Sequence, residues 1–347
     1  MTRGVLFACL ITLQLLPAPV FAGDRGFTID GWREAVVNVS SLDNYVAFFD
    51  EVAGWESRGG GAMDPDQLAM WGLSGRAARE QLMGNPGTTT GMVRLVEIAG
   101  SEQLIRPDSQ SWDTGGWFDI NMRVRDLQAK RLQLQRLGWQ GSSDPVTFTF
   151  GPFEVTEWIT RGPDGLTFAL IQRHRPPLEG WPHLREFSRS FNATEVVVDL
   201  PASQRFYGDV LGFEEYLSHT GASSGSGRNV LGLPLNLARE VVRDVRVLHP
   251  RGLNEGSVEL LAFQGLEGRD FSDRALPPNL GLLMLRFPVV GLDALVAHLE
   301  AAGIALAAPV STVQMPPYGE VRSFALRSPS GSWLEFFETQ TAIAPVP

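Results

Sequence analysis

The sequence predicts an α+β fold made of four similar units, each a strand followed by a helix and then several further strands. Two repeats indicate this arrangement. The phrase FFDEVAGWE at 48–56 recurs as FYGDVLGFE at 206–214, and the strand–helix stretch 119–139 is matched by 284–304. Because one such unit cannot bury both faces of its own small sheet, the units are expected to pair.

The first unit opens with a strand at 34–41, EAVVNVSS. Alternate residues from Ala35 form an apolar face that should meet a covering helix, while Glu34 and its alternate neighbours form the other face. A helix follows from 42, with apolar residues at helical spacing, and Gly54 is its stop signal.

The third unit repeats this pattern with a strand at 192–199 and a helix over 200–216 that contains the stop Gly212. The second and fourth units both finish on an Arg-x-Pro-x-Gly turn and an alternating strand, at 161–172 and 327–338. The segment 59–90 has no counterpart in the other units and is expected to add a helix to the first one.

The N-terminal segment 1–22 has the form of a secretory signal peptide: one basic residue, a short apolar run and small residues before a cleavage point near Ala22. It is too short to span a membrane comfortably. We therefore expect a secreted or periplasmic protein without stable membrane insertion. The single cysteine, Cys9, lies in this segment, so the mature chain has no disulfide.

The charge pattern argues against nucleic-acid binding. The net charge is −10, Lys130 is the single lysine, and no cluster of basic residues stands out.

Taken together, the strand followed by DL…FY.DVLGF and the closing strands with R.P.G…E resemble the vicinal oxygen chelate superfamily, which includes glyoxalase I, bleomycin-resistance proteins and extradiol dioxygenases. The resemblance covers nearly the whole mature chain. It implies four βαβββ modules paired into two glyoxalase-like domains with curved mixed sheets. Modules one and two would form a domain at 24–172 and modules three and four a domain at 191–340, with a linker at 173–190.

The resemblance also implies where a metal would bind, because enzymes of this superfamily take ligands from the first and last strands of each module. The carboxylates at or near those positions are Glu34, Glu97, Asp119, Glu259 and Glu335. None of the five histidines falls there, so an imidazole-held zinc site is not expected; an all-oxygen set would favour Mg, Mn or Ca over Zn. The first three residues would serve the first domain and the last two the second.

Glu335 is the candidate general base, because it keeps both the motif and the position. A cup lined by Trp333, Phe337, Arg286 and Tyr318 would bind the substrate. The alternative interpretation is structural: such glutamates are often solvated or pair with arginines, here Arg94, Arg123 and Arg286.

Two functions follow from the resemblance. The first is an exported protein that binds a small molecule in a cupped sheet, without the usual histidine-metal site and without proven catalysis. The second is a lyase, isomerase or dioxygenase-like enzyme that uses a carboxylate-held divalent metal. A homodimer is compatible with either function.

Overall fold

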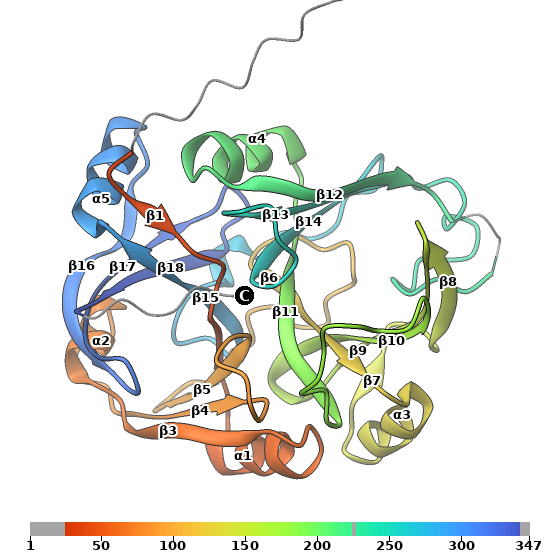
Figure 1. The fold of residues 1–347 in the computed structure, drawn as a ribbon, viewed down its shortest axis with the longest axis horizontal. Coiled ribbons are helices and arrows are strands. Elements are labelled where there is room, and N and C mark those ends of the chain that lie inside the picture. Colours follow the sequence, from red (N-terminus) through yellow and green to blue (C-terminus); the bar gives the residue numbers. More distant parts are fainter. Residues whose placement is uncertain (1–24, 224–226, 341–347) are drawn as a thin grey trace, which may run out of the picture.

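The structure, a computed structural model, describes residues 25–223 and 227–340. Two nine-stranded mixed sheets form the fold, one on each side of the molecule in Figure 1, with short helices around them. The predicted signal peptide at 1–22 lies outside the described residues. In the described part of the chain, no helix is long and apolar enough to cross a membrane.

The first sheet has the strand order β16-β17-β18-β15-β2-β5-β4-β3, with β1 added beside β15. Its strands from the early part of the chain are β1 (Thr28–Ile29), β2 (Glu34–Asn38), β3 (Glu56–Ala62), β4 (Ala78–Gly84) and β5 (Met92–Ile98). Its strands from the end of the chain are β15 (Gly281–Val290), β16 (Leu306–Met315), β17 (Gly319–Arg327) and β18 (Trp333–Thr339).

The second sheet uses the middle of the chain, in the order β12-β13-β14-β11-β6-β10-β9-β7, with β8 beside β9. Its first strands are β6 (Trp117–Val124), β7 (Gln140–Gly141), β8 (Val146–Phe150), β9 (Phe153–Arg161) and β10 (Thr167–Arg175). The others are β11 (Phe187–Val196), β12 (Glu214–Gly221), β13 (Arg243–His249) and β14 (Ser257–Phe263).

The module pairing differs from the predicted contiguous halves. The central antiparallel pair of the first sheet is β2 with β15, so module one joins module four; in the second sheet β6 pairs with β11, so module two joins module three. The predicted domains 24–172 and 191–340 therefore each contribute to both sheets. The predicted linker at 173–190 is also too long, because β10 extends to Arg175 and β11 begins at Phe187.

Each module carries its helix between its first two strands. These helices are α1 (Leu42–Glu51), α3 (Leu127–Arg136), α4 (Leu200–Gln204) and α5 (Leu292–Ala301), and two 3-10 turns, η1 (Pro163–Gly165) and η3 (Ser272–Arg274), lie in connections. The helix predicted over 200–216 is shorter: α4 continues as a π-helical segment, η2 (Arg205–Val210), and ends before Gly212. Gly212 has φ +79°, a left-handed conformation that favours glycine and stops the helix.

The segment 59–90 contains the expected helix, α2 (Pro65–Met70), but also most of β3 and all of β4. Asp64 caps α2 by accepting a hydrogen bond from the backbone N–H of Asp66. The segment is therefore part of the first sheet rather than a separate addition, and α2 packs against β16.

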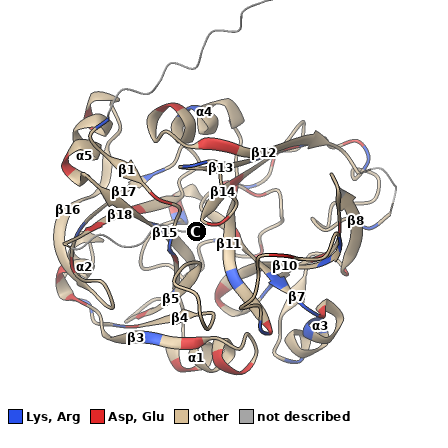
Figure 2. Ribbon diagram, in the orientation of Figure 1, with Lys and Arg blue, Asp and Glu red and all other residues tan. Residues whose placement is uncertain are grey.

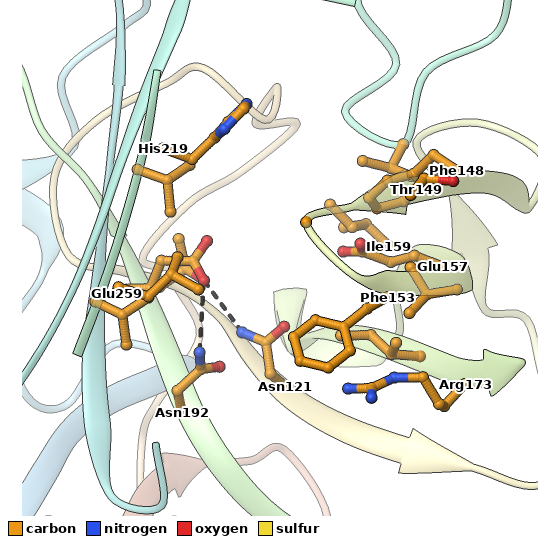
Figure 3. A pocket seen from close by; sticks show the side chains of 18 of the residues that line it. Asn121, Phe148, Thr149, Phe153, Glu157, Ile159, Arg173, Asn192, His219 and Glu259 are labelled. Carbon is orange, nitrogen blue, oxygen red and sulfur yellow. Dashed lines mark hydrogen bonds between the residues drawn. The ribbon is translucent and has the colours of Figure 1, made fainter. Parts of the chain in front are cut away.

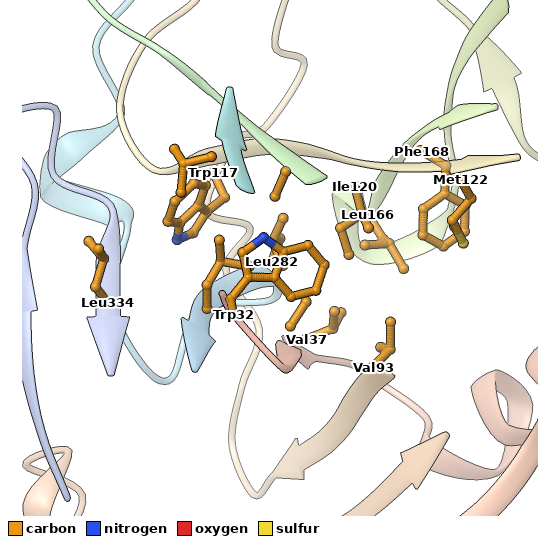
Figure 4. Packing of buried hydrophobic residues seen from close by; sticks show 14 of the residues in the cluster. Trp32, Val37, Val93, Trp117, Ile120, Met122, Leu166, Phe168, Leu282 and Leu334 are labelled. Carbon is orange, nitrogen blue, oxygen red and sulfur yellow. The ribbon is translucent and has the colours of Figure 1, made fainter. Parts of the chain in front are cut away.

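The largest hydrophobic core lies where the two sheets meet their helices and each other (Figure 4). Two tryptophans tie the sheets together through their indole nitrogens. Trp32 Nε1 donates to the carbonyl of Ser257 at 2.7 Å, and Trp117 Nε1 donates to the carbonyl of Trp333 at 2.9 Å. Both indoles are buried, so these cross-sheet bonds fix how the two sheets are placed.

Candidate functional site

Strand register places matching positions on the inner faces of the two sheets. In the first sheet Glu34 lies opposite Arg286, and Arg286 lies opposite Glu335. Arg94 lies opposite Val36, two residues after Glu34. We call this face, with Glu34, Arg94, Arg286 and Glu335, the first cup.

The second sheet repeats the same register with different residues. Asn192 lies opposite Asn121, and Asn121 lies opposite Ala169. Glu259 lies opposite Thr194, two residues after Asn192. We call the face with Asn121, Asn192 and Glu259 the second cup. The positions of Glu34, Arg94, Arg286 and Glu335 are thus taken here by Asn192, Glu259, Asn121 and Ala169.

A continuous network of ion pairs closes the first cup. Arg94 binds Glu34 through Nε at 2.7 Å and Nη2 at 3.0 Å, and its Nη1 lies 3.1 Å from Glu80. Arg286 bridges the other way, with Nη1 at 2.8 Å from Glu34 and Nε at 3.1 Å from Glu335. All five side chains are buried, so each charged group is stabilised by an oppositely charged neighbour rather than by water.

Polar and apolar groups from the inserted segment and from module four complete this closure. Trp71, which follows α2, donates from Nε1 to Glu335 at 3.0 Å, and the Ser323 hydroxyl donates to the same carboxylate at 3.0 Å. The Tyr318 hydroxyl donates to Glu34 at 3.2 Å. The apolar side chains packed around α2 in this cup include Val36, Leu68, Met70, Trp71, Met284, Ala325 and Trp333.

The electrostatics of Glu34 follow from this packing. Burial alone would raise the pKa of Glu34, but the Arg94 and Arg286 guanidiniums outweigh it and lower the pKa to about 2. Glu34 is therefore a fixed, ionised partner of two arginines and cannot act as a base near neutral pH.

The second cup instead surrounds a cavity of about 1170 Å³. The cavity walls come from β6, β8, β9, β10, β11, β12, β13 and β14, and residues between 176 and 181 of the linker lie along its edge. Figure 3 shows Glu259 and Asn192 on one side of it and Phe153, Glu157 and Arg173 on the other. A cavity of this size, mixed in polarity and lined by rings, is typical of a small-molecule site.

Three carboxyl groups line this cavity without an ion-pair partner. Among the described residues, no arginine, lysine or histidine nitrogen lies within 4.0 Å of Asp119, Glu157 or Glu259 in a salt bridge. Two amides reach these carboxyls at long hydrogen-bond distances: Asn192 Nδ2 donates to Glu259 at 3.4 Å and Asn121 Nδ2 donates to Asp119 at 3.3 Å.

Burial raises the pKa of all three groups. The pKa of Asp119 rises to about 7 through burial. For Glu157, burial and then repulsion by Asp119 raise the pKa to about 7. For Glu259, burial and then repulsion by Asp119 and Glu157 raise the pKa to about 8. Carboxyls that change charge near neutral pH inside a cavity are characteristic of functional sites.

The structure divides the predicted site residues between several places. Glu34, Arg286, Glu335 and Tyr318 do come together, in the closed first cup. Trp333 belongs to the core around α2, and Phe337 packs against Tyr318 with ring centroids 5.0 Å apart. These predicted substrate-binding residues are therefore internal packing groups, with Trp333 only 7% exposed and Phe337 0%.

The predicted metal ligands are not assembled as one set. Glu97 points away from the first cup because Arg94 and Val96 take the inner face of β5. Its carboxylate accepts from the Leu42 N–H at the start of α1 at 2.7 Å and from Arg79 at 2.9 Å. Asp119 and Glu259 line the second cup, in the other sheet from Glu34 and Glu335.

Neither cup offers a donor set that suits the metal site implied by the resemblance. Two of the matching positions in the first cup are guanidiniums, which repel a cation, and its carboxylates are already ion-paired. The second cup has two amides, one alanine and one carboxylate at those positions. Within the described ranges, no three His, Cys, Asp or Glu side chains are placed to hold a metal ion.

Glu157, Asn121 and Asn192 were not among the site residues predicted from the sequence. The signal for Glu157 was present: in FEVTEWITR (153–161), Val155, Glu157 and Ile159 alternate on one face, and all three line the cavity. What the sequence did not show was the pairing of module two with module three, which places that face opposite Glu259.

Comparison with known proteins bears on the fold. No family model and no curated protein matches the chain. Glyoxalase I from Zea mays has a similar structure, with a TM-score of 0.56, 13% identity, and coverage of 90% of this chain and 93% of that one. A Bacillus subtilis protein described as a candidate dioxygenase gives a TM-score of 0.55 at 11% identity, covering 91% of this chain and 87% of that one. The chain thus has the fold of the vicinal oxygen chelate superfamily.

Proposed function

We propose that this protein binds a small organic molecule in the second cup and that the first cup is a structural core. One observation carries the proposal: a cavity of about 1170 Å³ is lined by the buried Asp119 and the partly buried Glu157 and Glu259, and none of these carboxyl groups has an ion-pair partner in the described chain. Unpaired buried carboxyls destabilise an empty protein, so their retention in a cavity favours a ligand that satisfies them.

The walls of the cavity suit an organic ligand. Phe118, Phe153, Phe191 and Trp181 supply ring surface, while amides and carboxyls supply a few hydrogen-bonding groups. This combination orients a partly apolar molecule, as small-molecule pockets generally do. The metal-dependent alternative is less well supported because the donor set of neither cup suits the metal.

A pair of matched substitutions tests the site. Val245 on β13 lines the cavity, whereas Val310 on β16 is exposed on the other sheet. A library of small molecules is first screened against the wild-type protein by thermal shift, and binders are confirmed by calorimetry. We expect Val245→Trp to weaken binding by about ten-fold or more by filling the cavity, and Val310→Trp to leave it unchanged. Equal binding by wild type and Val245→Trp would place the ligand elsewhere.

The same preparation distinguishes the metal-dependent alternative. Purified protein is dialysed against Mg, Mn, Ca and Zn in turn, and bound metal is measured. We expect no stoichiometric metal and no change in ligand affinity after chelation. One metal per chain that is lost in Glu259→Gln would favour the enzyme instead.

Export is part of the proposal, on the basis of the segment 1–22. Sequencing the N-terminus of protein recovered from the periplasm or medium should give a start near Gly23. A homodimer is likewise proposed, and sedimentation velocity on the mature chain would distinguish it from a monomer.

A further inference from the structure

The second cup contains unpaired charged groups of both signs that are kept apart. At one end of its inner face, Asp119 on β6 and Glu259 on β14 both lie opposite Thr194 of the intervening strand. Asn192 belongs to the same end and is only 4% exposed. Its Nδ2 donates to Glu259, and its Oδ1 has no hydrogen-bond partner among the described residues. This end of the cavity therefore has hydrogen-bond acceptors that a ligand's hydrogen-bond donor could satisfy.

The other end offers guanidinium groups. Arg123 on β6 and Arg173 on β10 line the cavity, and each lies over a ring: Arg123 is 4.4 Å from the Phe191 centroid, and Arg173 is 4.0 Å from that of Phe153. In both, the Nε atom is buried without a hydrogen-bond partner in the described part of the chain. No carboxylate lies within salt-bridge distance of either side chain there, although Glu255 nearby pairs with Arg189 at 4.0 Å.

Strand geometry separates the two ends. Asp119 and Arg123 are four residues apart on the same face of β6, which corresponds to about 13 Å along an extended strand. Glu157 is influenced by both ends: repulsion by Asp119 raises its pKa, and attraction to Arg123 lowers it. Within the described chain, the carboxyls and guanidiniums of the second cup thus form no ion pair with each other, whereas those of the first cup do.

We infer that the ligand is a dipolar organic molecule, with a positively charged nitrogen at the Asp119–Asn192–Glu259 end and an anionic group at the Arg123–Arg173 end. The inference rests on the proposed function and specifies its ligand class. An ammonium group matches acceptors that have no ion-pair partner, a carboxylate matches the guanidinium groups, and an apolar chain fits the ring surface that lines the cavity.

A matched series of eight-carbon compounds tests this assignment by calorimetry. 8-Aminooctanoate carries both charges, octylamine carries only the ammonium, and octanoate carries only the carboxylate. We expect 8-aminooctanoate to bind at least about ten-fold more tightly than either single-charge compound, because it satisfies both ends of the cavity.

Two substitutions assign the ends. Glu259→Gln should reduce the affinity for 8-aminooctanoate and octylamine but not for octanoate, while Arg173→Met should reduce it for 8-aminooctanoate and octanoate but not for octylamine. The controls are Glu97→Gln and Arg175→Met; Glu97 binds the start of α1 and Arg175 pairs with Glu154 outside the cavity. Circular dichroism and melting temperature verify that each variant folds.

Equal affinity for the three compounds, or equal effects of Glu259→Gln on octylamine and octanoate, would overturn the inference. Failure of 8-aminooctanoate to bind would overturn it as well. The proposed function is judged separately. If a neutral library compound binds the wild type and binds Val245→Trp more weakly, the cavity is a binding site and only the dipolar ligand is rejected.

Discussion

The two cups are built on the same strand register but hold opposite electrostatic arrangements. In the first cup, Glu34 and Glu335 are bound by Arg94 and Arg286, and α2 packs its apolar side chains over them. In the second, Glu259 takes the position of Arg94, and the cavity beside it is open enough to hold a molecule.

This difference shows how the same strand register can build a structural core in one sheet and a cavity in the other. In a cup whose carboxylates are ion-paired, no carboxylate is left to bind a ligand. In a cup whose carboxyls are unpaired, those carboxyls destabilise the protein until a ligand binds them. The charged residues are interspersed along the ribbon rather than gathered on one side (Figure 2), so the contrast lies in local pairing and not in overall charge.

The largest difference in stability between the cups should come from replacing the ionisable residues at matching positions, Arg94 and Glu259, with uncharged ones. Arg94→Met leaves Glu34 and Glu80 without their shared partner and should lower the free energy of unfolding by about 3–5 kcal/mol. Glu259→Gln replaces a carboxyl that has no ion-pair partner and should change the free energy of unfolding by less than about 1 kcal/mol. Chemical denaturation measures both; equal losses would mean that the second cup is as tightly coupled as the first.

The tryptophans of the two cups extend this contrast. Trp71→Ala removes a buried indole from the first cup and should destabilise the fold by about 3–5 kcal/mol. Trp181→Ala, at the edge of the cavity, should cost about 1 kcal/mol because the ring is half-buried. Its main effect should be on ligand affinity, measured by calorimetry, and a large stability loss would make Trp181 a core residue instead.

The pH dependence of stability should have opposite signs for the two cups. The pKa of Glu34 is lowered in the fold, so its contribution is present above its unfolded pKa and is lost as the pH falls toward about 2. The pKa of Glu259 is raised to about 8, so the fold binds this proton more tightly and loses stability as the pH rises from about 4.5 to 8.

Melting curves between pH 5 and pH 8 measure this effect. We expect the wild type to lose stability over that range and Glu259→Gln to lose less. The same slope in both proteins would show that Glu259 does not hold its proton.

The smallest effect should come from Glu97, the predicted metal ligand that lies outside both cups. Glu97→Gln weakens the contacts to Leu42 and Arg79 near the surface and should change the free energy of unfolding by less than about 1 kcal/mol. Ligand affinity should not change. A measurable loss of ligand affinity in Glu97→Gln would show that Glu97 contributes to the binding site.

The four-module fold could be predicted because each module repeats its own strand, helix and turn signals. The glycines that end α1 and η2, Gly54 and Gly212, both have positive φ, which explains why the sequence retains glycine there. The pairing of modules could not be predicted, because each inner strand has the same alternating pattern and any two modules could bury each other's sheet.

The candidate site was harder to predict for the same reason. Glu34 and Glu335 were predicted as metal ligands, and the structural alternative, pairing with arginines such as Arg94 and Arg286, is the one the structure shows for Glu34. Which cup is closed by packed side chains depends on where α2 lies in the fold, and no local sequence pattern determines that. The carboxylate of Glu157 became significant only through a neighbour from another module.

The most direct test of the contrast is a carbon-13 NMR titration of the side-chain carboxyls of Glu34 and Glu259 in one sample. We expect Glu259 to titrate with a midpoint near its pKa of about 8, and Glu34 to remain ionised until the protein unfolds in acid. Assignments come from Glu34→Gln and Glu259→Gln. A midpoint near 4 for Glu259, as in an exposed glutamate, would contradict the account, because Glu259 would then be an ordinary solvated carboxyl.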